Sequence, residues 1–289
     1  MLNKLKQFEL NDGFNNTNLK EVKLYKASTN IVSREFLYVY DTFVIFVLNR
    51  NKELRLEHTT LKYDIHNYLI SSATLPFEYE LFASKDNSFY SLMISLDETI
   101  MYQVMQKLST ENTTTLIDEE EIGVFTDSVT PEIENIVMRL FYILESKEES
   151  EVLGESILTE LFYRILKSEK ANILHKFFDK KSNEAKISRV LKKIHKNYHN
   201  YISIPDLAKE EDISIASLYT YFKKITLLSP LQYIKKLRLN QAHYLISDKK
   251  FKVLDAAYAV GYESTSQFSR EYKKYFGYPP SASKNTELT

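Results

Sequence analysis

Short segments rich in β-branched and aromatic residues follow one another between residues 31 and 95. They are EFLYVY (35–40), TFVIFVL (42–48), LEHTTLKY (56–63), NYLISS (67–72), FEYELF (77–82) and SFYSLMIS (88–95). Polar, turn-forming stretches separate several of them, at 49–53, 64–67 and 84–87. Runs of this kind are typical of strands, and their regular spacing predicts a β-barrel or sandwich.

From Asp97 onward the apolar residues recur at helical spacing. The pattern predicts three helices, near 97–108, 131–144 and 152–166. The helix pair at 132–168 carries wide apolar faces, which either cover the barrel or form the contact of a homodimer, and both interpretations stay open. A charge-rich junction at 174–186 follows, and we place the domain boundary within it, so that the domains are 1–181 and 182–289.

The C-terminal half contains an internal repeat. FKKITLLSP (222–230) matches YKKYFGYPP (272–280) at an offset of 50, and LAKEEDIS (207–214) matches AAYAVGYE (256–263) at an offset of 49. Each copy is predicted to form a short helix, a tight turn and a second helix. The repeat therefore predicts two helix-turn-helix units.

Small and turn-forming residues occupy equivalent places in the two copies. Ala208 and Ala257 allow the two helices of each unit to approach closely. Gly261 can adopt positive φ without strain, and Asp212 tolerates that conformation better than most residues. The N-caps expected from the sequence are Ser203, Ser214 and Ser264, with Ser229 capping a connecting helix at Pro230–Ser247.

The second helix of each unit divides into an apolar and a polar face. The apolar stripes are Leu218, Phe222 and Ile225 in the first copy, and Phe268, Tyr272, Tyr275 and Phe276 in the second. Polar and basic residues lie opposite both stripes. A helix with such a face suits the major groove of double-stranded DNA, where Gln and Arg side chains read base edges.

Composition narrows the alternatives. The chain has only five glycines, at least 16 residues apart, so it holds no glycine-rich phosphate loop of the dinucleotide-binding, P-loop or protein-kinase type. It has no cysteine, which excludes disulfides, thiolate metal sites and thiol nucleophiles. The longest apolar run, Phe43–Leu48, is far shorter than the ~20 residues of a membrane span. Without a signal peptide at its start, the chain is expected to be cytoplasmic and not membrane-bound.

Charge is distributed unevenly behind a net value of −1. Residues 1–181 hold 20 Lys and Arg against 29 Asp and Glu, whereas residues 182–289 hold 18 against 10. The basic half is the one that carries the repeat. This coincidence favours a module that binds a polyanion such as DNA.

RLNQAHYLI (238–246) and VLDAAYAVGYESTSQFSREYKKYFGYPPS (253–281) resemble the signature of the arabinose-regulator (AraC/XylS) family of bacterial transcription factors. The resemblance covers 185–282, and it departs where Asp212 and Leu227 replace glycines that are usual in the first unit. It implies DNA contacts from Ala216, Tyr219, Thr220, Lys223, Thr265, Ser266, Gln267 and Arg270, to which we add Lys274 as a phosphate contact. Since the first set is poor in hydrogen-bonding groups, we expect the second helix to carry more of the discrimination.

The N-terminal half is similar to the cupin-like sensor domain of one subgroup of these regulators, on residues 46–81, 129–144 and 157–177. The resemblance implies an α+β fold of two domains: a cupin-like β-barrel with appended helices, then an all-α domain of two helix-turn-helix units joined by a linker helix. Such sensor domains bind small effectors or mediate dimerisation. Cupin enzymes hold metal through an H-x-H pair, but here His58 and His66 are eight residues apart. We therefore expect no metal, no cofactor and no catalytic residues.

Aromatic residues alternate along the expected strands, so some must point into the barrel. They are Phe36, Tyr38, Tyr40, Phe43, Phe46, Tyr68, Phe77 and Tyr79. Either they fill the interior, or they line a pocket for a small, mainly apolar effector.

Together these features predict a sequence-specific DNA-binding transcription regulator that is controlled by a small effector or partner. The family favours an activator that contacts RNA polymerase. Two alternatives stay open: a constitutive DNA-binding protein whose barrel only dimerises, and a cupin-type enzyme fused to a DNA-binding domain.

Overall fold

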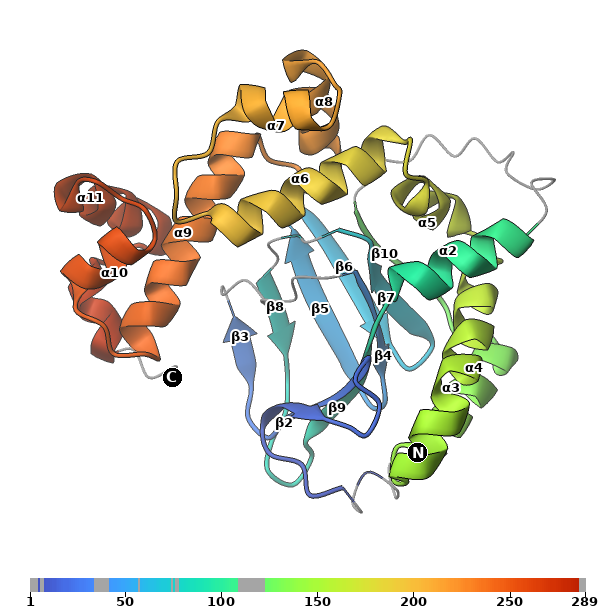
Figure 1. The fold of residues 1–289 in the computed structure, drawn as a ribbon. Helices are drawn as coiled ribbons and strands as arrows, with labels where there is room; N and C mark the ends of the chain where they lie inside the picture. The colour runs from blue at the N-terminus through green and yellow to red at the C-terminus, as the bar shows by residue number, and fades with distance from the viewer. Residues whose placement is uncertain are drawn as a thin grey trace. The chain divides into compact units, whose positions relative to one another are not determined.

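The structure is a computed structural model, and it describes residues 5, 8–33, 42–56, 58–73, 75, 78–108 and 123–285. The chain divides into two compact units, Met1–Ser188 and Arg189–Thr289. The first unit combines a β-sheet with helices and the second is entirely helical (Figure 1). The predicted α+β class with two domains is confirmed.

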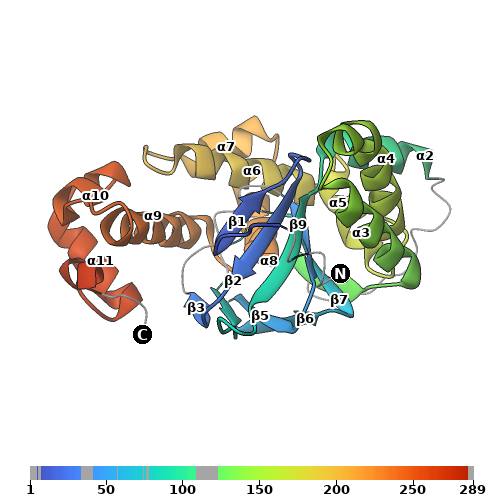
Figure 2. The same cartoon turned by 90° about the horizontal axis from the view of Figure 1, so that it is seen from below.

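The described residues of the first unit form a ten-stranded antiparallel sheet. Its strands run in the order β1-β2-β9-β4-β7-β6-β5-β8-β3, with β10 also paired to β7. Their bounds are β1 Gly13–Asn16, β2 Val22–Ala27, β3 Ile31–Ser33, β4 Phe43–Val47, β5 Asn51–Leu56, β6 Thr59–Asp64, β7 Asn67–Ser71, β8 Glu78–Leu81, β9 Phe89–Ser95 and β10 Val124–Ser128. The sheet curls strongly into a half-barrel (Figure 2).

Four of the predicted strands, at 42–48, 67–72, 77–82 and 88–95, correspond to β4, β7, β8 and β9. Two expectations were wrong. The stretch 49–53 is not simply a turn, because β5 begins at Asn51, and the run 56–63 spans the tight turn between β5 and β6. Three consecutive polar residues at the start of β5, Asn51, Lys52 and Glu53, hid its strand character. The segment 35–40 lies outside the described residues, and β1, β2 and β10 were not predicted.

Both faces of the sheet are covered in its middle. Every residue of β4 is buried, and the two faces alternate along it. Val44 and Phe46 belong to a core shared with the helices, whereas Phe43 and Ile45 point to the opposite, inner face. This burial on both sides explains the uninterrupted apolar run at 43–48.

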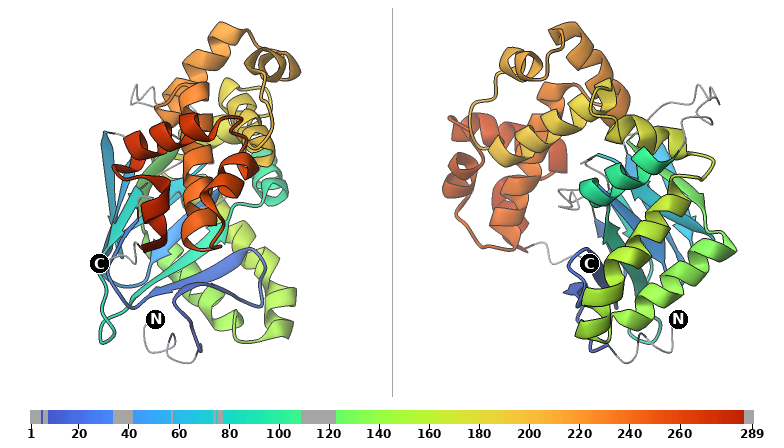
Figure 3. Two further views of the ribbon diagram at one scale, coloured as in Figure 1. Left: turned by 90° about the vertical axis from the view of Figure 1, so that its left-hand side faces the viewer. Right: turned by 45° about the vertical axis from the view of Figure 1, so that its right-hand side comes forward.

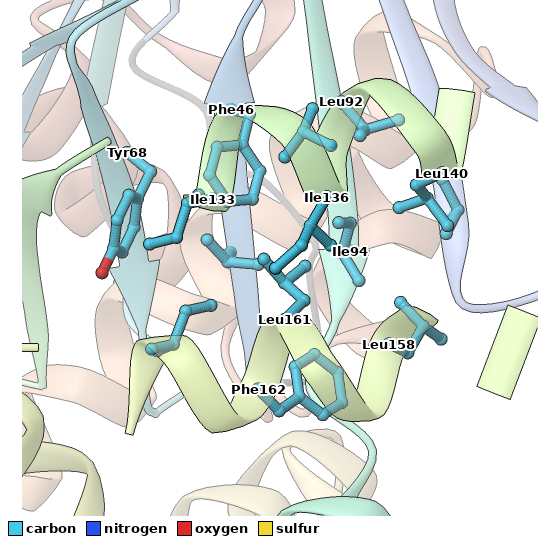
Figure 4. Close-up of a cluster of buried hydrophobic side chains, with 14 of the residues drawn as sticks. Phe46, Tyr68, Leu92, Ile94, Ile133, Ile136, Leu140, Leu158, Leu161 and Phe162 are labelled. Atoms are coloured by element: carbon cyan, nitrogen blue, oxygen red, sulfur yellow. The ribbon is translucent and has the colours of Figure 1, made fainter. Parts of the chain in front are cut away.

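Four helices pack around the outer face: α2 (Glu98–Lys107), α3 (Pro131–Ile143), α4 (Lys147–Ile165) and α5 (Ala171–Phe178). Asp97, Thr130 and Ser146 accept backbone N–H bonds at the starts of α2, α3 and α4. Figure 3 (right) shows α3 and α4 side by side across the sheet, and Figure 4 shows their apolar side chains meeting those of the strands. Helix α5 occupies the start of the charge-rich junction at 174–186, and the domain boundary placed within that junction stays a prediction.

The apolar residues of α3 and α4 mostly cover the sheet. Leu140 and Leu144, which could have belonged to a dimer contact, are 0% and 1% exposed and lie in the core with Phe46 and Ile94. Apolar side chains that do face solvent on this helix pair are Tyr142, Val152, Leu153 and Tyr163. An apolar contact of this helix pair with another molecule would use that second set.

The inner face of the sheet contains an unexpected charge. Lys52 lies on β5 between outward-facing residues and is only 4% exposed. Its Nζ is 4.1 Å from the centre of the Tyr79 ring, 5.4 Å from that of Tyr25 and 5.9 Å from that of Phe89. Because β5 is separated from β2 and β9 along the sheet, these distances show how tightly the sheet curls.

The aromatic residues expected inside the barrel divide between the two faces. Phe43 and Tyr79 belong to the inner face, whereas Phe46 and Tyr68 pack against the helices. Phe36, Tyr38, Tyr40 and Phe77 lie outside the described residues.

The second unit consists of α6 (Asn183–Asn197, which begins in the first unit), α7 (Ile204–Glu210), α8 (Ile215–Thr226), α9 (Pro230–Ser247), α10 (Val253–Ala259), α11 (Thr265–Phe276) and the 3-10 turn η2 (Pro280–Asn285). The repeat is confirmed, since α8 and α11 are offset by 50 residues, and α7 and α10 by 49. No helix in the described part of the chain is long and apolar enough to cross a membrane.

Lys52 makes the stability of the fold depend on pH. Desolvation by burial lowers the pKa of Lys52 to about 7 from its ordinary 10.5. Between those values the unfolded chain binds the lysine proton and the folded chain does not, so stability from this residue rises with pH. Lys52→Met should raise the melting temperature most below pH 7, where the charge is buried, and the advantage over wild type should shrink toward pH 10. Parallel pH curves for the two proteins would show that the ammonium is not desolvated.

Candidate nucleic-acid interface

Each repeat folds as two short helices that cross at a small residue. Ala208 of α7 and Ala257 of α10 are 1% and 0% exposed. The turns that follow reverse the chain through positive φ, at Asp212 (+51°) and Gly261 (+87°). A side chain larger than alanine at the crossing would separate the helices, and a β-branched residue in the turn would be strained.

Serine hydroxyls fix the starts of the second helices. Ser214 Oγ accepts the N–H of Ser217 at 3.0 Å, and Ser264 Oγ accepts the N–H of Gln267 at 3.3 Å. Ser203 caps α7 in the same way, and Ser229 forms a reciprocal capping box with Gln232 at the start of α9. Together these caps fix where α8 and α11 begin, and hence which side chains occupy their first turns.

The apolar stripes anchor the second helices to the domain. In α8, Leu218, Phe222 and Ile225 are completely buried, and in α11 the most buried positions are Phe268 and Tyr272. Consequently the opposite side of each helix faces solvent. The nine predicted contact residues all lie there: Ala216, Thr220, Lys223, Ser266, Gln267, Arg270 and Lys274 are exposed, and Tyr219 and Thr265 are half-buried.

The exposed groups of the two helices differ in what they can offer a ligand. Thr220 Oγ1 donates to the Ala216 carbonyl at 3.0 Å, so its proton is already used within α8. Gln267 Nε2 donates to Glu271 only at the long distance of 3.4 Å. Arg270 and Lys274 form no ion pair within the described residues. Exposed cationic side chains without an ion pair in the described residues thus lie on both helices, Lys223 on α8 and Arg270 and Lys274 on α11, and the only guanidinium among them is on α11.

Sequence reasoning missed Glu271, the acidic residue of α11. It accepts hydrogen bonds from Lys235 Nζ of α9 at 2.9 Å and from the Tyr262 hydroxyl at 2.9 Å. Burial alone would raise the pKa of Glu271, but these bonds and the one from Gln267 outweigh it and hold the pKa below its ordinary value. Glu271 thus orients α11 and holds the Gln267 side chain. The i, i+4 spacing of Gln267 and Glu271 is the signal that could have found it.

Ion pairs attach the first helix-turn-helix unit to α6. Glu211, at the end of α7, has a side chain that is 5% exposed. Its two oxygens accept bonds from Arg189 Nε and Lys193 Nζ, each at 2.7 Å. Breaking one partner of such a buried set would leave an uncompensated charge, so these residues fix α7 relative to α6.

A single guanidinium attaches the second helix-turn-helix unit to the segment that directly follows α6. Arg238 of α9 donates from Nε to the Tyr198 carbonyl at 2.7 Å, from one terminal nitrogen to the Asn200 carbonyl at 2.8 Å, and from the other to the Gly261 carbonyl at 3.2 Å. The turn at Gly261 passes so close that an added Cβ would lie 2.4 Å from the His199 carbonyl oxygen. Glycine is required there for space as well as for φ.

Each half of the C-terminal domain also contains a buried histidine that contacts a tyrosine hydroxyl. His195 Nε2 lies 2.5 Å from the hydroxyl of Tyr233, which in turn packs edge-on against Phe222. Burial lowers the pKa of His195 to about 4, so the ring is neutral at physiological pH. In the second half His243 Nδ1 lies 2.6 Å from the Tyr272 hydroxyl.

The departure at Leu227 does not change how α8 ends. Leu227 adopts φ +61° and donates its N–H to the Lys223 carbonyl at 2.8 Å. Gly277 ends α11 with φ +85° and a bond of 2.9 Å to Lys273. The two exits are therefore equivalent, and the first carries the strain of a non-glycine residue in the left-handed region, of about 1–2 kcal/mol.

Potential metal ligands of the described residues do not form a cluster. In the ranges that the structure describes, no three His, Asp or Glu side chains come together in a way that could hold a metal ion. His58 and His66 lie at the two ends of β6 rather than together.

Comparison with known families matches both units. Residues 18–173 match the model of the AraC-type transcriptional regulator N-terminus, and residues 207–286 match a helix-turn-helix domain model. The first match alone spans more than half of the chain. The chain belongs to the AraC-type family of transcriptional regulators. Its predicted family resemblance is thereby confirmed.

Individual relatives agree with this assignment. The chain is 30% identical over 131 residues to the Msm operon regulatory protein of Streptococcus mutans, covering 45% of this chain and 47% of that protein. It is 32% identical over 132 residues to the raffinose operon regulator RafR of Pediococcus pentosaceus, covering 46% and 47%. The chain thus spans about half the length of these AraC-type relatives.

A solved structure covers nearly the whole AraC-type chain. Apo ToxT from Vibrio cholerae, in a single-residue variant, superposes on this chain with a TM-score of 0.61. The superposition covers 96% of this chain and 100% of the ToxT chain, and the two sequences are 14% identical. Wild-type ToxT bound to an unsaturated fatty acid gives 0.57, with 95% of each chain covered at 15% identity. These two likenesses show that the fold is shared.

Gly261 and Gly277 of the second helix-turn-helix unit allow a matched test of the close contact between the Gly261 turn and the segment after α6. Gly261→Ala and Gly277→Ala impose a similar φ strain, of about 1–2 kcal/mol, but only the first places a methyl group against a carbonyl. Gly261→Ala should therefore lower the free energy of unfolding by more than about 3 kcal/mol, and Gly277→Ala by about 1–2 kcal/mol. Urea denaturation followed by circular dichroism measures both. Equal losses would mean that the close approach at Gly261 is not rigid.

Proposed function

We propose that this AraC-type regulator binds double-stranded DNA through both helix-turn-helix units and activates transcription through RNA polymerase. The observation that carries the proposal is the pair of capped, anchored helices α8 and α11, each with a solvent-facing polar side. Two of the curated relatives are described as activators, the RhaS regulator of Mannheimia succiniciproducens and the lactose operon activator of Staphylococcus xylosus. We place the protein in the cytoplasm, where such a regulator meets its DNA.

One chain can occupy two successive major grooves. The 18-residue helix α9 has a length of about 27 Å, against about 34 Å for one DNA turn, and it packs against α8 near one end and α10 and α11 toward the other (Figure 1). The nine contact residues divide by chemistry. Gln267 and Arg270 would hydrogen-bond base edges, Ala216 would contact a thymine methyl group, and Lys223 and Lys274 would neutralise phosphates.

The functional boundary after Lys181 stays part of the proposal. Ser182 Oγ accepts the Ala185 N–H at 3.0 Å and so caps α6. A DNA-binding domain of residues 182–289 therefore contains the whole of α6. It also keeps Arg189 and Lys193, which bond to Glu211 of the first helix-turn-helix unit.

The N-terminal unit, residues 1–181, would control DNA binding by accepting a small, mainly apolar effector or a partner. Its inner sheet face is lined by aromatic and aliphatic side chains, and the fold neighbour ToxT is described with a bound unsaturated fatty acid. The alternatives are a constitutive regulator whose barrel only dimerises and, with less support, a cupin-type enzyme fused to the DNA-binding domain. A change in DNA affinity on addition of an effector would exclude the constitutive regulator. Metal analysis of the purified protein would distinguish the cupin-type enzyme from the regulator.

Arg270 and Lys274 should have different effects on DNA binding. Arg270→Ala should cost about 1–3 kcal/mol on the cognate site and relax sequence preference at one or two base pairs. Lys274→Ala should weaken cognate and random DNA alike and reduce the slope of log affinity against log salt by about 1. Titration of labelled duplexes at several salt concentrations measures both variants. If each variant weakens cognate and random DNA by the same factor, the assignment of Arg270 to bases is wrong.

A second copy of the chain is proposed to dock on the solvent-facing apolar residues of α3 and α4. Val152 is 69% exposed and Leu153 is 44% exposed. The double change Val152→Glu and Leu153→Glu should give a folded monomer that binds a single site normally and loses the avidity for paired sites, by about 10²-fold or more. Ile65→Glu, at a 50% exposed apolar residue elsewhere in the unit, is the control. A double variant that remains dimeric in light scattering would place the dimer contact elsewhere.

A further inference from the structure

The interior of the curled sheet holds two polar groups that the fold does not use. The first is the Lys52 ammonium, which is surrounded by the rings of Tyr25, Tyr79 and Phe89. Among the described residues, no hydrogen bond or ion pair is formed by its Nζ, and no charged group shifts its pKa. A buried and unpaired lysine is rare in folded proteins because desolvation of the charge is costly.

The second group is the hydroxyl of Tyr63. This side chain is 1% exposed, and its oxygen has no hydrogen-bond partner among the described residues. Burial raises the pKa of Tyr63, so the phenol keeps its proton and remains a donor. An unsatisfied buried hydroxyl also destabilises the fold, by about 1–3 kcal/mol.

The two groups lie beside each other. Lys52 of β5 and Tyr63 of β6 are directly paired in the sheet register, and both side chains point to the inner face. Neighbouring positions in antiparallel strands place their side chains within reach of one partner. Two adjacent donors without an acceptor, bordered by aromatic rings, form half of a site for an anion with an apolar body.

We propose that Lys52 and Tyr63 together bind the carboxylate of a small apolar effector inside the N-terminal sheet. The carboxylate would accept hydrogen bonds from Lys52 Nζ and from the Tyr63 hydroxyl, and its apolar part would lie against Tyr79, Tyr25 and Phe89. The proposal rests on the sensor function proposed above, and it specifies the chemical class of the effector. Binding restores the pairing that the two buried donors lack, so the anion stabilises the unit that holds it.

This assignment makes an unusual prediction about the two side chains. Residues that merely stabilise the fold lower stability when they are removed. Lys52→Met and Tyr63→Phe keep the shape and delete only the unpaired polar group, so each variant should melt at or above the wild-type temperature while it binds carboxylates less well. Loss of binding with gain of stability distinguishes a ligand site from a structural one.

The test measures melting temperatures of the full chain with butyrate, octanoate, palmitate and benzoate, each compared with the alcohol of the same carbon skeleton. At least one carboxylate should raise the wild-type melting temperature while its alcohol does not, and the rise should vanish in Lys52→Met and weaken about three- to tenfold in apparent affinity in Tyr63→Phe. Lys62→Met, on the same strand as Tyr63 but with a side chain that is 70% exposed, should respond like wild type.

Three results would overturn the proposal: no carboxylate acts on the wild type, Lys52→Met responds as wild type does, or both variants melt well below it. DNA affinity of the wild type, measured in parallel without any carboxylate, tests the proposed DNA binding independently. Normal DNA binding with no carboxylate response would reject the Lys52 site and leave the regulator function standing.

Discussion

The three hydrogen bonds of the Arg238 guanidinium determine how the DNA-binding half is built. They join the helix that links the two repeats to the end of α6 and to the turn of the second helix-turn-helix unit. Hydrogen bonds from a charged donor contribute about 1.5–3 kcal/mol each, and here they act on carbonyls that have left regular helix. Glu211 holds the first helix-turn-helix unit to α6 as well. The recognition helices α8 and α11 are therefore both positioned relative to α6. A rigid pair of helices can recognise two grooves, whereas two loosely tethered ones could not fix their spacing.

The duplicated units reach the same backbone geometry by different means. In the second unit glycines occupy both left-handed positions, while the first unit uses Asp212 and Leu227 and so carries strain at each. The first unit is attached through ion pairs of Glu211 and the second through the carbonyl contacts of Arg238. The more polar exposed face also belongs to the second unit, at Gln267 and Arg270. Anchoring is thus shared between the units, and the proposed base-reading residues Gln267 and Arg270 belong to the second.

Much of the DNA-binding half could be predicted from the sequence because its determinants are local. The offsets of 50 and 49 residues, the serine caps and the turn at Gly261 all depend on residues close in the chain. The contacts of Glu271 with Lys235 and of Glu211 with Arg189 were missed because they join distant segments. In the N-terminal half the same limit applied more strongly. Strand β5 was obscured by the consecutive polar residues Asn51, Lys52 and Glu53 at its start, and nothing in the sequence marked Lys52 as the buried one.

The central claim is that one chain places two recognition helices in successive grooves at a spacing fixed by α9. The direct measurement starts from sites selected out of random DNA and inserts about 5 bp, half a helical turn, or about 10 bp, a full turn, between the two half-sites. The account predicts that selected sites contain two half-sites, that half a turn lowers affinity at least about tenfold, and that a full turn does not restore it, because α9 cannot lengthen. Selected sites with a single half-site, or affinity that is restored by the full turn, would contradict it.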